Sequence, residues 1–491
     1  MSGARPAGTS HAVILRNAFF LILSQAIVTP MAMVINAVMG RYPGATEFGQ
    51  LYLAGTFTAL GFLLVEWGQG ALLTGEVARN RDRAGELLGS SIAFRLAASV
   101  LVGGALVLIA LHQGRDRAFA VVVLLVVLSS AMGTVVGAAQ DTVRGFERMD
   151  FGAASYVGWQ VLRLAVVVPT VLLGGRIRGV LLAQAVCGAV GLVVVLGLLV
   201  RVGVPRLGLR LATVKELFTR GTPFLVFGLA TALQLNVDAV FMAKFASPEA
   251  VGWYAAAAKL QGALIYPAGV LIAAIYPTLC RLHLEDPDAY RRTAAAALRT
   301  TTILVVPIAL CCFLYPDVGV RLYSRDSFLP AEDDLRIMAA YLFLVYFSMP
   351  VGTSLVAAGK QRAWAITQFG CVFTSLVLSP ILIRHFQATR GNGGLGVCIS
   401  SVCAEVLMVV IGVALLPRAI FDRTFQRKLA LALLAAVVMA GVGMTTLRLT
   451  SFVSAPLALG AYLACLWLTG VLDRRQLETL RGLLRKQAPA A

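Results

Sequence analysis

The chain has 491 residues, of which 59% are hydrophobic and 13% charged, with a net charge of +18 and a mean hydropathy of +0.83. This hydrophobicity excludes an ordinary soluble domain. The apolar residues form stretches of about 20 residues, long enough to cross the ~30 Å hydrocarbon core of a bilayer as helices. We predict an all-α polytopic membrane protein with fourteen spans, at 17–40, 48–72, 89–112, 118–140, 152–174, 179–200, 221–245, 252–279, 300–316, 335–357, 363–383, 394–416, 429–447 and 451–472.

The excess of basic residues indicates topology. With the N-terminus in the cytoplasm, 27 Lys and Arg residues fall on the cytoplasmic side of the spans, 12 on the outer side and three inside spans. This asymmetry is what the positive-inside rule gives when both termini are cytoplasmic. The net charge is thus accounted for by the membrane, and we expect no DNA or RNA partner.

Nothing in the sequence indicates an enzyme, a metal or a cofactor. The eight cysteines lack zinc-ligand or redox spacing, and the four histidines are scattered. Connections are too short for a catalytic domain, and no phosphate-binding Gly-Lys-Ser/Thr loop occurs. Asp286-Pro287-Asp288 resembles the Asp-x-Asp signature of sugar-nucleotide transferases, but it lies in a short cytoplasmic loop and is interpreted as solvated. The sequence contains no recognisable acid/base or nucleophile constellation.

A faint internal repeat predicts two equivalent halves. Gly49-Gln50-Leu51-Tyr52 opens the second span, and Gly252-Trp253-Tyr254-Ala255 opens the eighth. Arg79 follows Gly49 by 30 residues, and Arg281 follows Gly252 by 29. Parallel repeats of this kind place two lobes around an axis along the membrane normal. We therefore expect six-helix lobes at 1–205 and 206–418 around a central cavity, and an appendage at 419–491 with two spans and a cytoplasmic tail.

Six ionisable residues fall inside the predicted spans, where each costs roughly 2.5–3.5 kcal/mol on insertion scales and is a candidate for function. They are Glu66, Arg95, Arg163, Asp238, Lys259 and Glu405. Glu66 and Arg95 lie at similar depth on consecutive helices and are interpreted as a structural ion pair. Asp238 and Lys259 repeat this arrangement at the outer end of the hairpin formed by the seventh and eighth spans, where a static pair and a functional pair are equally acceptable. Gln234 shares a helical face with Asp238.

Arg163 and Glu405 differ because both fall near the bilayer midplane, one in each predicted half. Gln160 lies on the face of Arg163, and Gln25 and Asn36 share one face of the first span. Such faces suit a water-filled cavity, although hydrogen bonds that only hold a bundle together are the alternative. A guanidinium in this setting suits a diphosphate, which it binds bidentately. We predict substrate-binding roles for Arg163, Lys259, Gln25, Asn36, Gln160 and Gln234, and ion-coupling roles for Asp238 and Glu405.

Several short motifs carry a family resemblance. They are Asn236-Val237-Asp238, the run from Ala250 to Leu260 with Gly252-Trp253-Tyr254 and Lys259, Tyr276-Pro277, Glu47-Phe48-Gly49 and Glu76-Val77-Ala78-Arg79. Over most of residues 12–420 the chain resembles the lipid-linked oligosaccharide flippases of the multidrug/oligosaccharidyl-lipid/polysaccharide exporter (MOP) superfamily. The resemblance implies a bacterial inner-membrane protein that carries a polyprenyl-diphosphate-linked sugar across by alternating access. It also implies membrane lipids, a polysaccharide polymerase and glycosyltransferases as partners.

Three other functions remain open from the sequence. Within transport, they are a cation-coupled multidrug exporter of the same superfamily and a flippase for the peptidoglycan precursor. From a different class, the chain could be a membrane-embedded scaffold or polymerase of a polysaccharide assembly.

Overall fold

The computed structural model describes residues 24, 27–112, 117–146, 149–321, 327–421, 423–446 and 450–471, and all their regular secondary structure is helical. Packing divides the chain into a first unit, Met1–Ala255, and a second unit, Ala256–Ala491. The boundary lies inside α9 (Pro248–Glu285). The all-α, multi-pass architecture predicted from hydropathy is confirmed.

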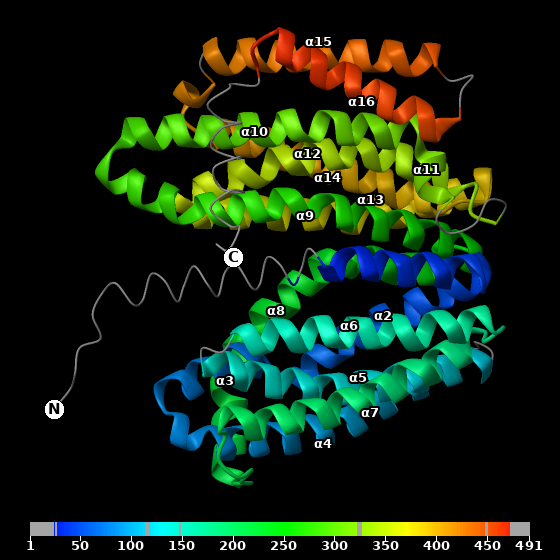
Figure 1. Ribbon diagram of the computed structural model, residues 1–491, viewed down its shortest axis with the longest axis vertical. Coiled ribbons are helices and arrows are strands. Elements are labelled where there is room, and N and C mark those ends of the chain that lie inside the picture. The colour runs from blue at the N-terminus through cyan, green and yellow to red at the C-terminus, as the bar shows by residue number, and fades with distance from the viewer. Residues whose placement is uncertain are drawn as a thin grey trace, which may run out of the picture. The chain divides into compact units, whose positions relative to one another are not determined.

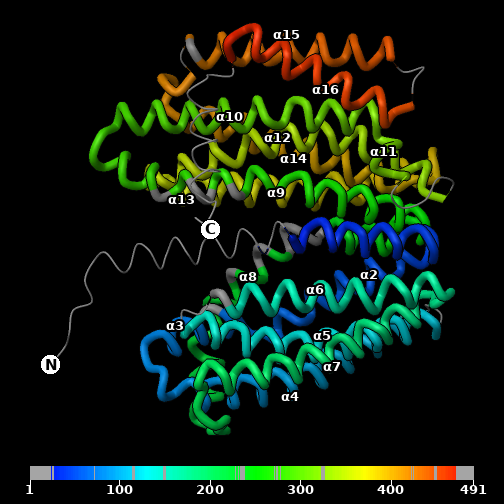
Figure 2. The backbone as a smooth tube through the Cα atoms, in the orientation of Figure 1, coloured from blue at the N-terminus to red at the C-terminus, as the bar shows by residue number. Residues whose placement is uncertain are grey.

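The first unit is a helical bundle. Its helices are α2 (Gly44–Glu66), α3 (Gln69–Arg79), η1 (Arg81–Arg83), α4 (Ala84–His112), α5 (Arg117–Gly145), α6 (Met149–Leu172), α7 (Ile177–Val202) and α8 (Leu211–Phe245), preceded by a described helical stretch at Ile27–Arg41. Figure 2 shows α4, α5 and α7 running side by side. A hydrophobic core of this unit joins α3 to these helices and includes Leu73, Leu88, Ala138 and Val195, all buried. Helix α8 packs against α2, α3 and α4 and so belongs to this unit.

The second unit contains α10 (Pro287–Leu314), α11 (Pro316–Val320), α12 (Ala331–Ala357), α13 (Gln361–Arg390), α14 (Gly394–Leu415), η2 (Arg418–Ile420), α15 (Arg423–Thr445) and α16 (Ser451–Leu468). Helices α10, α12, α13 and α14 form its centre. The α15–α16 hairpin lies against α10 (Figure 1). The Tyr462 hydroxyl fastens it there by donating to the Ile303 carbonyl at 2.9 Å.

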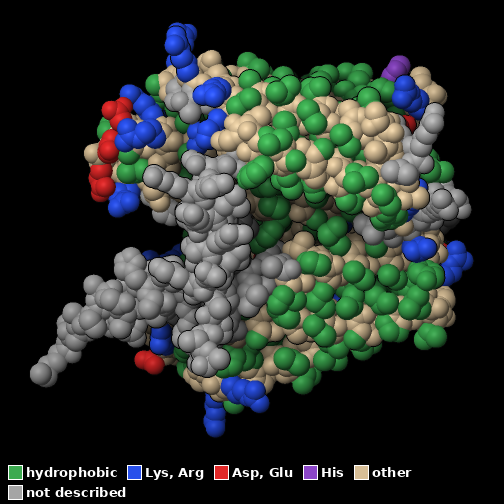
Figure 3. All heavy atoms as spheres, turned by 45° about the horizontal axis from the view of Figure 1, so that its top comes forward, with side chains coloured by type: hydrophobic (Ala, Val, Ile, Leu, Met, Phe, Trp, Pro, Cys, Tyr) green, Lys and Arg blue, Asp and Glu red, His purple; other side chains and the backbone are tan. Residues whose placement is uncertain are grey.

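Eleven helices of the described residues are long and apolar enough to cross a membrane. The other three predicted spans correspond to Ile27–Arg41, α8 and α9. The division into lobes at 1–205 and 206–418 stays a prediction. Figure 3 shows Lys and Arg side chains at the edges of the surface, with hydrophobic side chains and backbone between them. That distribution suits helices whose ends reach water and whose middles contact lipid.

The span predicted at 48–72 as one helix is wrong, because the helix breaks after Glu66. Trp67 and Gly68 both adopt left-handed backbone conformations, with φ of 47° and 66°. A Cβ on Gly68 would lie 2.6 Å from the Gly221 carbonyl oxygen, so the break lets α8 cross the chain closely. The Trp67 indole holds this crossing by donating to the Phe218 carbonyl at 3.0 Å and stacking on the Phe218 ring.

Two loop motifs have structural roles. Asp286 is the N-cap of α10, with its side chain accepting from the Asp288 and Ala289 amides and Pro287 in the first turn. The Asp286-Pro287-Asp288 segment, which resembles the Asp-x-Asp signature, is therefore the N-terminal cap of a helix. Gly391 follows the last residue of α13 with a φ of 67°, in the turn that leads to α14.

Candidate functional site

A buried polar cluster lies beside the break between α2 and α3. Arg95 of α4 is only 1% exposed. It donates to the Thr134 carbonyl at 2.8 Å, and its Nη2 lies 3.9 Å from Asp141 Oδ2. Glu66 interacts electrostatically with both Arg95 and Asp141 but forms no ion-pair contact with Arg95 in the described part of the chain. The predicted pair of Glu66 and Arg95 is thus part of a cluster of three charged groups. Within it, Arg95 forms its ion pair with Asp141 and not with Glu66.

The first residue of α3 extends this cluster. Gln69 is fully buried and accepts a hydrogen bond from Ser91 at 2.6 Å. Its Nε2 and the Arg95 Nε are buried donors without a hydrogen-bond partner among the described residues. Broken helices in transporters place polar groups inside the membrane in this way. Sequence reasoning missed Gln69 because it lies inside an apolar run, and Asp141 because it lies one residue beyond the predicted fourth span.

Arg163 of α6, unlike Arg95, has no acidic side chain beside it among the described residues. It is half-buried, and no carboxylate of the described residues lies within salt-bridge distance. It interacts electrostatically with Tyr156 and Cys187, and Gln160, one turn earlier, is 3% exposed with its Nε2 unpartnered in the described structure. Arg163 and Gln160 therefore lie one turn apart on α6, and the Arg163 guanidinium has no acidic partner in the described part of the chain.

The two repeat glycines meet in the first unit. A Cβ on Gly49 would lie 2.3 Å from the Pro248 carbonyl oxygen, and one on Gly252 would lie 2.0 Å from the Ala45 carbonyl oxygen. The helix backbones thus touch where both residues lack side chains. The repeat tyrosines Tyr52 and Tyr254 also pack edge to face, with ring centroids 6.2 Å apart.

Polar contacts surround this crossing. Thr46 donates to Glu249 at 2.9 Å, which joins the first turns of α2 and α9. Asp238 of α8 interacts electrostatically with Tyr52. Asp238, predicted to couple ions, is therefore placed beside the crossing. Asn36 is half-buried in the same unit.

In the second unit, Glu405 of α14 is 8% exposed. Its Oε1 accepts a hydrogen bond from the Ser348 hydroxyl of α12. No basic side chain of the described residues lies within ion-pair distance of Glu405. Lys259 is exposed in this unit. Gln25 and the side chain of Gln234 lie outside the described residues, and the substrate and coupling roles of all these residues stay predictions.

A second buried carboxylate in this unit was not predicted. Asp334, in the first turn of α12, is fully buried. Its Oδ1 accepts from Asn392 Nδ2 at 3.2 Å, and its Oδ2 has no hydrogen-bond partner in the described structure. It was missed because Glu332 and Asp333 precede it, and such an acidic run is typical of an exposed helix start.

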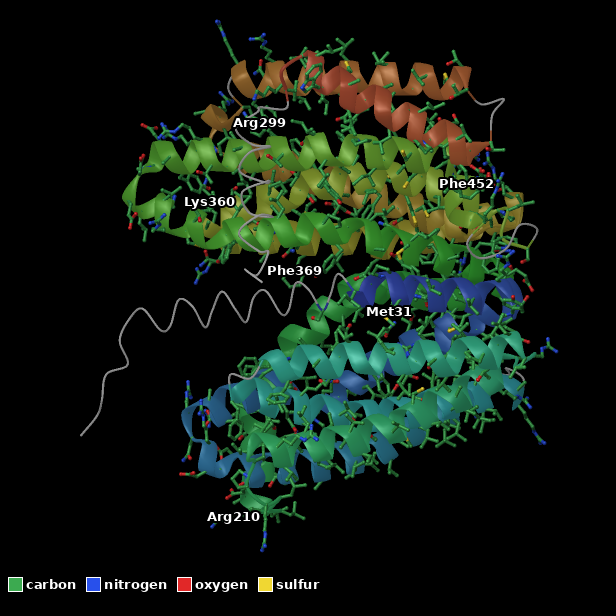
Figure 4. The ribbon with its side chains drawn as sticks, in the orientation of Figure 1. Met31, Arg210, Arg299, Lys360, Phe369 and Phe452 are labelled. Atoms are coloured by element: carbon green, nitrogen blue, oxygen red, sulfur yellow. The ribbon has the colours of Figure 1, made fainter. Side chains whose placement is uncertain are left out.

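A network of ion pairs holds the beginning of α8 to α3 and η1. Arg83 lies 3.0 Å from Glu216, and Arg220 lies 2.7 Å from Glu76 and 2.9 Å from Glu216. The hydrogen bond from Arg83, followed by that from Arg220, lowers the pKa of Glu216. Nearby, Arg210, labelled in Figure 4, donates its amide to Ser90 at 3.2 Å. These contacts anchor α8 in the first unit.

Known proteins identify the family of this chain. The family described as "Polysaccharide biosynthesis protein" matches residues 14–283, more than half of the chain. The chain belongs to the polysaccharide biosynthesis protein family. No curated protein matches it significantly.

Solved structures show that this polysaccharide biosynthesis protein has the fold of the MOP superfamily. The lipid II flippase MurJ in an inward closed conformation matches with a TM-score of 0.67 and 13% identity, over 94% of this chain and 99% of that one. An inward-facing multidrug resistance MATE transporter matches with a TM-score of 0.58 and 15% identity, over 82% and 96%. A MOP-superfamily transporter from Pyrococcus furiosus matches with a TM-score of 0.55 and 14% identity, over 86% and 96%.

No group of three or more His, Cys, Asp or Glu side chains in the described ranges could hold a metal ion.

Proposed function

We propose that this protein carries a polyprenyl-diphosphate-linked oligosaccharide from the cytoplasmic to the outer leaflet of the inner membrane, by alternating access, for surface polysaccharide biosynthesis. The match to the polysaccharide biosynthesis family over residues 14–283 carries this proposal. The fold supports it, because structures similar along nearly the whole chain include a lipid flippase. In this proposal both termini are cytoplasmic, as the distribution of Lys and Arg indicates.

Arg163 is the residue that we assign to the diphosphate. Among the basic side chains described inside the membrane part of the first unit, Arg95 already has Asp141 beside it, whereas Arg163 has no carboxylate within salt-bridge distance. A cation without an internal counter-charge is costly in a membrane and is stabilised by an anionic ligand. The planar guanidinium donates paired hydrogen bonds to phosphate oxygens, and Gln160 supplies a further unpartnered amide donor on the same helix.

Glu405 is our candidate for ion coupling. A buried carboxylate with one hydroxyl donor and no nearby basic group needs a counter-charge, which a proton or a metal cation supplies. If that counter-charge binds in only one conformation, an ion gradient biases the transport equilibrium by the difference in affinity between conformations. Asp238, beside the α2–α9 crossing, is the second candidate.

The test reconstitutes the purified full chain into liposomes with a fluorescent polyprenyl-diphosphate-linked sugar. Transport is followed as the fraction of sugar that a membrane-impermeant periodate reagent reaches. Hydrogen bonds to charged groups contribute about 1.5–3 kcal/mol each. We therefore expect Arg163→Ala to weaken binding of the lipid-linked sugar, and so to raise the sugar-lipid concentration that half-saturates transport, roughly ten- to a hundredfold. Arg163→Lys keeps the positive charge but loses the planar, paired donors of the guanidinium. Its transport should therefore lie between that of Arg163→Ala and that of the unaltered protein.

Arg291→Ala is the matched control, because Arg291 is an exposed arginine paired with Asp288 at 3.0 Å outside the spans. It should transport normally. Equal transport by Arg163→Ala and the control would overturn the assignment of Arg163. Absence of sugar-lipid transport together with efflux of an organic cation would overturn the function itself in favour of a multidrug exporter.

A further inference from the structure

A basic pocket lies between the two C-terminal helices of the second unit. It has a volume of about 320 Å³ and is lined by Arg423, Arg427, Lys428, Leu431, Thr469, Gly470 and Val471. Three of these residues are cationic, and they come from the beginning of α15. The rest of the polar lining comes from the end of α16. In Figure 1 these two helix ends lie together on the left, and Figure 4 places Phe452, at the other end of α16, on the right.

Among the described residues, three cationic side chains and no acidic one line the pocket. Arg423 and Arg427 are exposed, and neither forms an ion pair with a described residue. These cations lie near the N-terminus of α15, which is the positive end of the helix dipole, and the first turn contains no acidic residue. In the sequence, residues 418–428 include four basic residues and one acidic residue. This arrangement favours an anion.

The backbone carbonyls at the end of α16, beside the pocket, already accept hydrogen bonds within the chain. Gly470 has a φ of 67°, its amide donates to the Trp467 carbonyl at 3.2 Å, and the Val471 amide donates to the Leu466 carbonyl at 3.1 Å. The Thr469 hydroxyl donates to the Cys465 carbonyl at 2.8 Å. This is a Schellman-type helix end, in which the last carbonyls accept hydrogen bonds from the turn. The carbonyls therefore do not compete with an anion for the arginines.

The surroundings place the pocket at the level of the membrane interface. Trp467, two residues before Thr469, is 59% exposed, and exposed tryptophans concentrate where hydrocarbon meets headgroups. Along α15, Arg427 shares a face with Leu431, Leu434 and Val438 by helical spacing. Leu434 and Val438 are 52% and 40% exposed, so an apolar stripe continues from the cations toward the hydrocarbon. A ligand in this pocket meets charge at one end and apolar surface at the other.

We propose that this pocket binds the phosphate headgroup of an anionic glycerophospholipid, with its acyl chains along the Leu434–Val438 stripe. Basic pockets between membrane helices on the cytoplasmic side are suited to such headgroups. Arg423 and Arg427 supply the phosphate contacts, and the exposed stripe supplies the apolar contact that a free anion cannot use. The site is separate from Arg163 and does not depend on which substrate the protein carries.

Native mass spectrometry of the purified full chain, titrated with phosphatidylglycerol, tests the site. We expect Arg423→Gln/Arg427→Gln to weaken phosphatidylglycerol binding roughly thirtyfold, which corresponds to about 2 kcal/mol. Both side chains are exposed, so the variant should fold. The matched control is Arg291→Gln/Arg292→Gln, which removes the same charge from two exposed arginines at the start of α10. It should change binding less than about threefold if the pocket, and not the net charge, binds the lipid.

Three results would overturn the proposal. The first is equal loss in the two double variants, which shows attraction by net charge alone. The second is equal binding of phosphatidylcholine and phosphatidylglycerol by the unaltered protein, which shows that the anionic headgroup is not recognised. The third is displacement of phosphatidylglycerol by inorganic phosphate at equal concentration, which shows a free-anion site. The last two measurements need no variant and therefore stand even if the double substitution impairs folding.

Discussion

The crossing of α2 and α9 gives a sharp prediction, because the two backbones meet with no room for a side chain. Gly252→Ala places a Cβ 2.0 Å from the Ala45 carbonyl oxygen, and Gly49→Ala places one 2.3 Å from the Pro248 carbonyl oxygen. An ordinary contact begins at 3.4 Å, so the atoms must separate by 1.4 Å (3.4 less 2.0) and 1.1 Å (3.4 less 2.3). The obstacles are backbone atoms, which cannot rotate away, and the helices themselves must move.

Overpacking of this kind typically costs about 1–3 kcal/mol. In a unit of this size each kcal/mol lowers the midpoint of thermal unfolding by roughly 2–4 °C. We therefore expect Gly252→Ala to lower the melting temperature of the purified protein by about 4–8 °C, for a cost near the middle of that range. The Thr46–Glu249 hydrogen bond of 2.9 Å should weaken with it, because it joins the same helix ends.

Gly55→Ala on α2 is the control, since a Cβ there meets nothing within 4 Å. Alanine is the better helix former by about 0.5–1 kcal/mol, so this variant should be at least as stable as the unaltered protein. Thermal unfolding in detergent and glycan export in cells are measured for both variants. If Gly252→Ala melts at the same temperature as Gly55→Ala, the close approach is not a constraint and the reasoning fails.

Two further predictions concern charge. Arg95→Leu should destabilise the first unit by about 3 kcal/mol, the lower end for breaking a buried pair, because Asp141 loses its buried counter-charge but keeps the half-exposed Arg144 at 3.1 Å. Adding Asp141→Asn should recover part of the loss, and denaturation of the single and double variants measures both. The hydrogen bond from Arg83 lowers the pKa of Glu216 in the folded protein. The ionised Glu216 carboxylate therefore stabilises the fold fully above the ordinary glutamate pKa of about 4.3, and this stabilisation is lost as the pH falls through the lower pKa of the folded state. Glu216→Gln should therefore be less stable at pH 7 by about 1 kcal/mol or less, with a difference that shrinks in acid. A difference that stays constant down to pH 3.5 would contradict that account.

Hydropathy determined most of the fold because the bilayer acts on each helix separately. A span must satisfy its own backbone hydrogen bonds and present apolar side chains, so its signature is local. The stretch predicted at 179–200 is α7, Ile177–Val202, and that predicted at 394–416 is α14, Gly394–Leu415. Predicted ends differ where polar residues continue a helix beyond the membrane, as in α8, which begins at Leu211 and not at 221.

The partners of the polar groups were decided by tertiary structure alone. Helical spacing shows which residues share a face but not which helix that face meets. It therefore singled out Arg95 as a charged residue within an apolar helix without revealing its partner Asp141, 46 residues further along the chain on α5. It likewise paired Gly49 with Gly252 as repeats without showing that they touch. A break such as that at Trp67 depends on α8 crossing from more than 150 residues away, and no local pattern records that crossing.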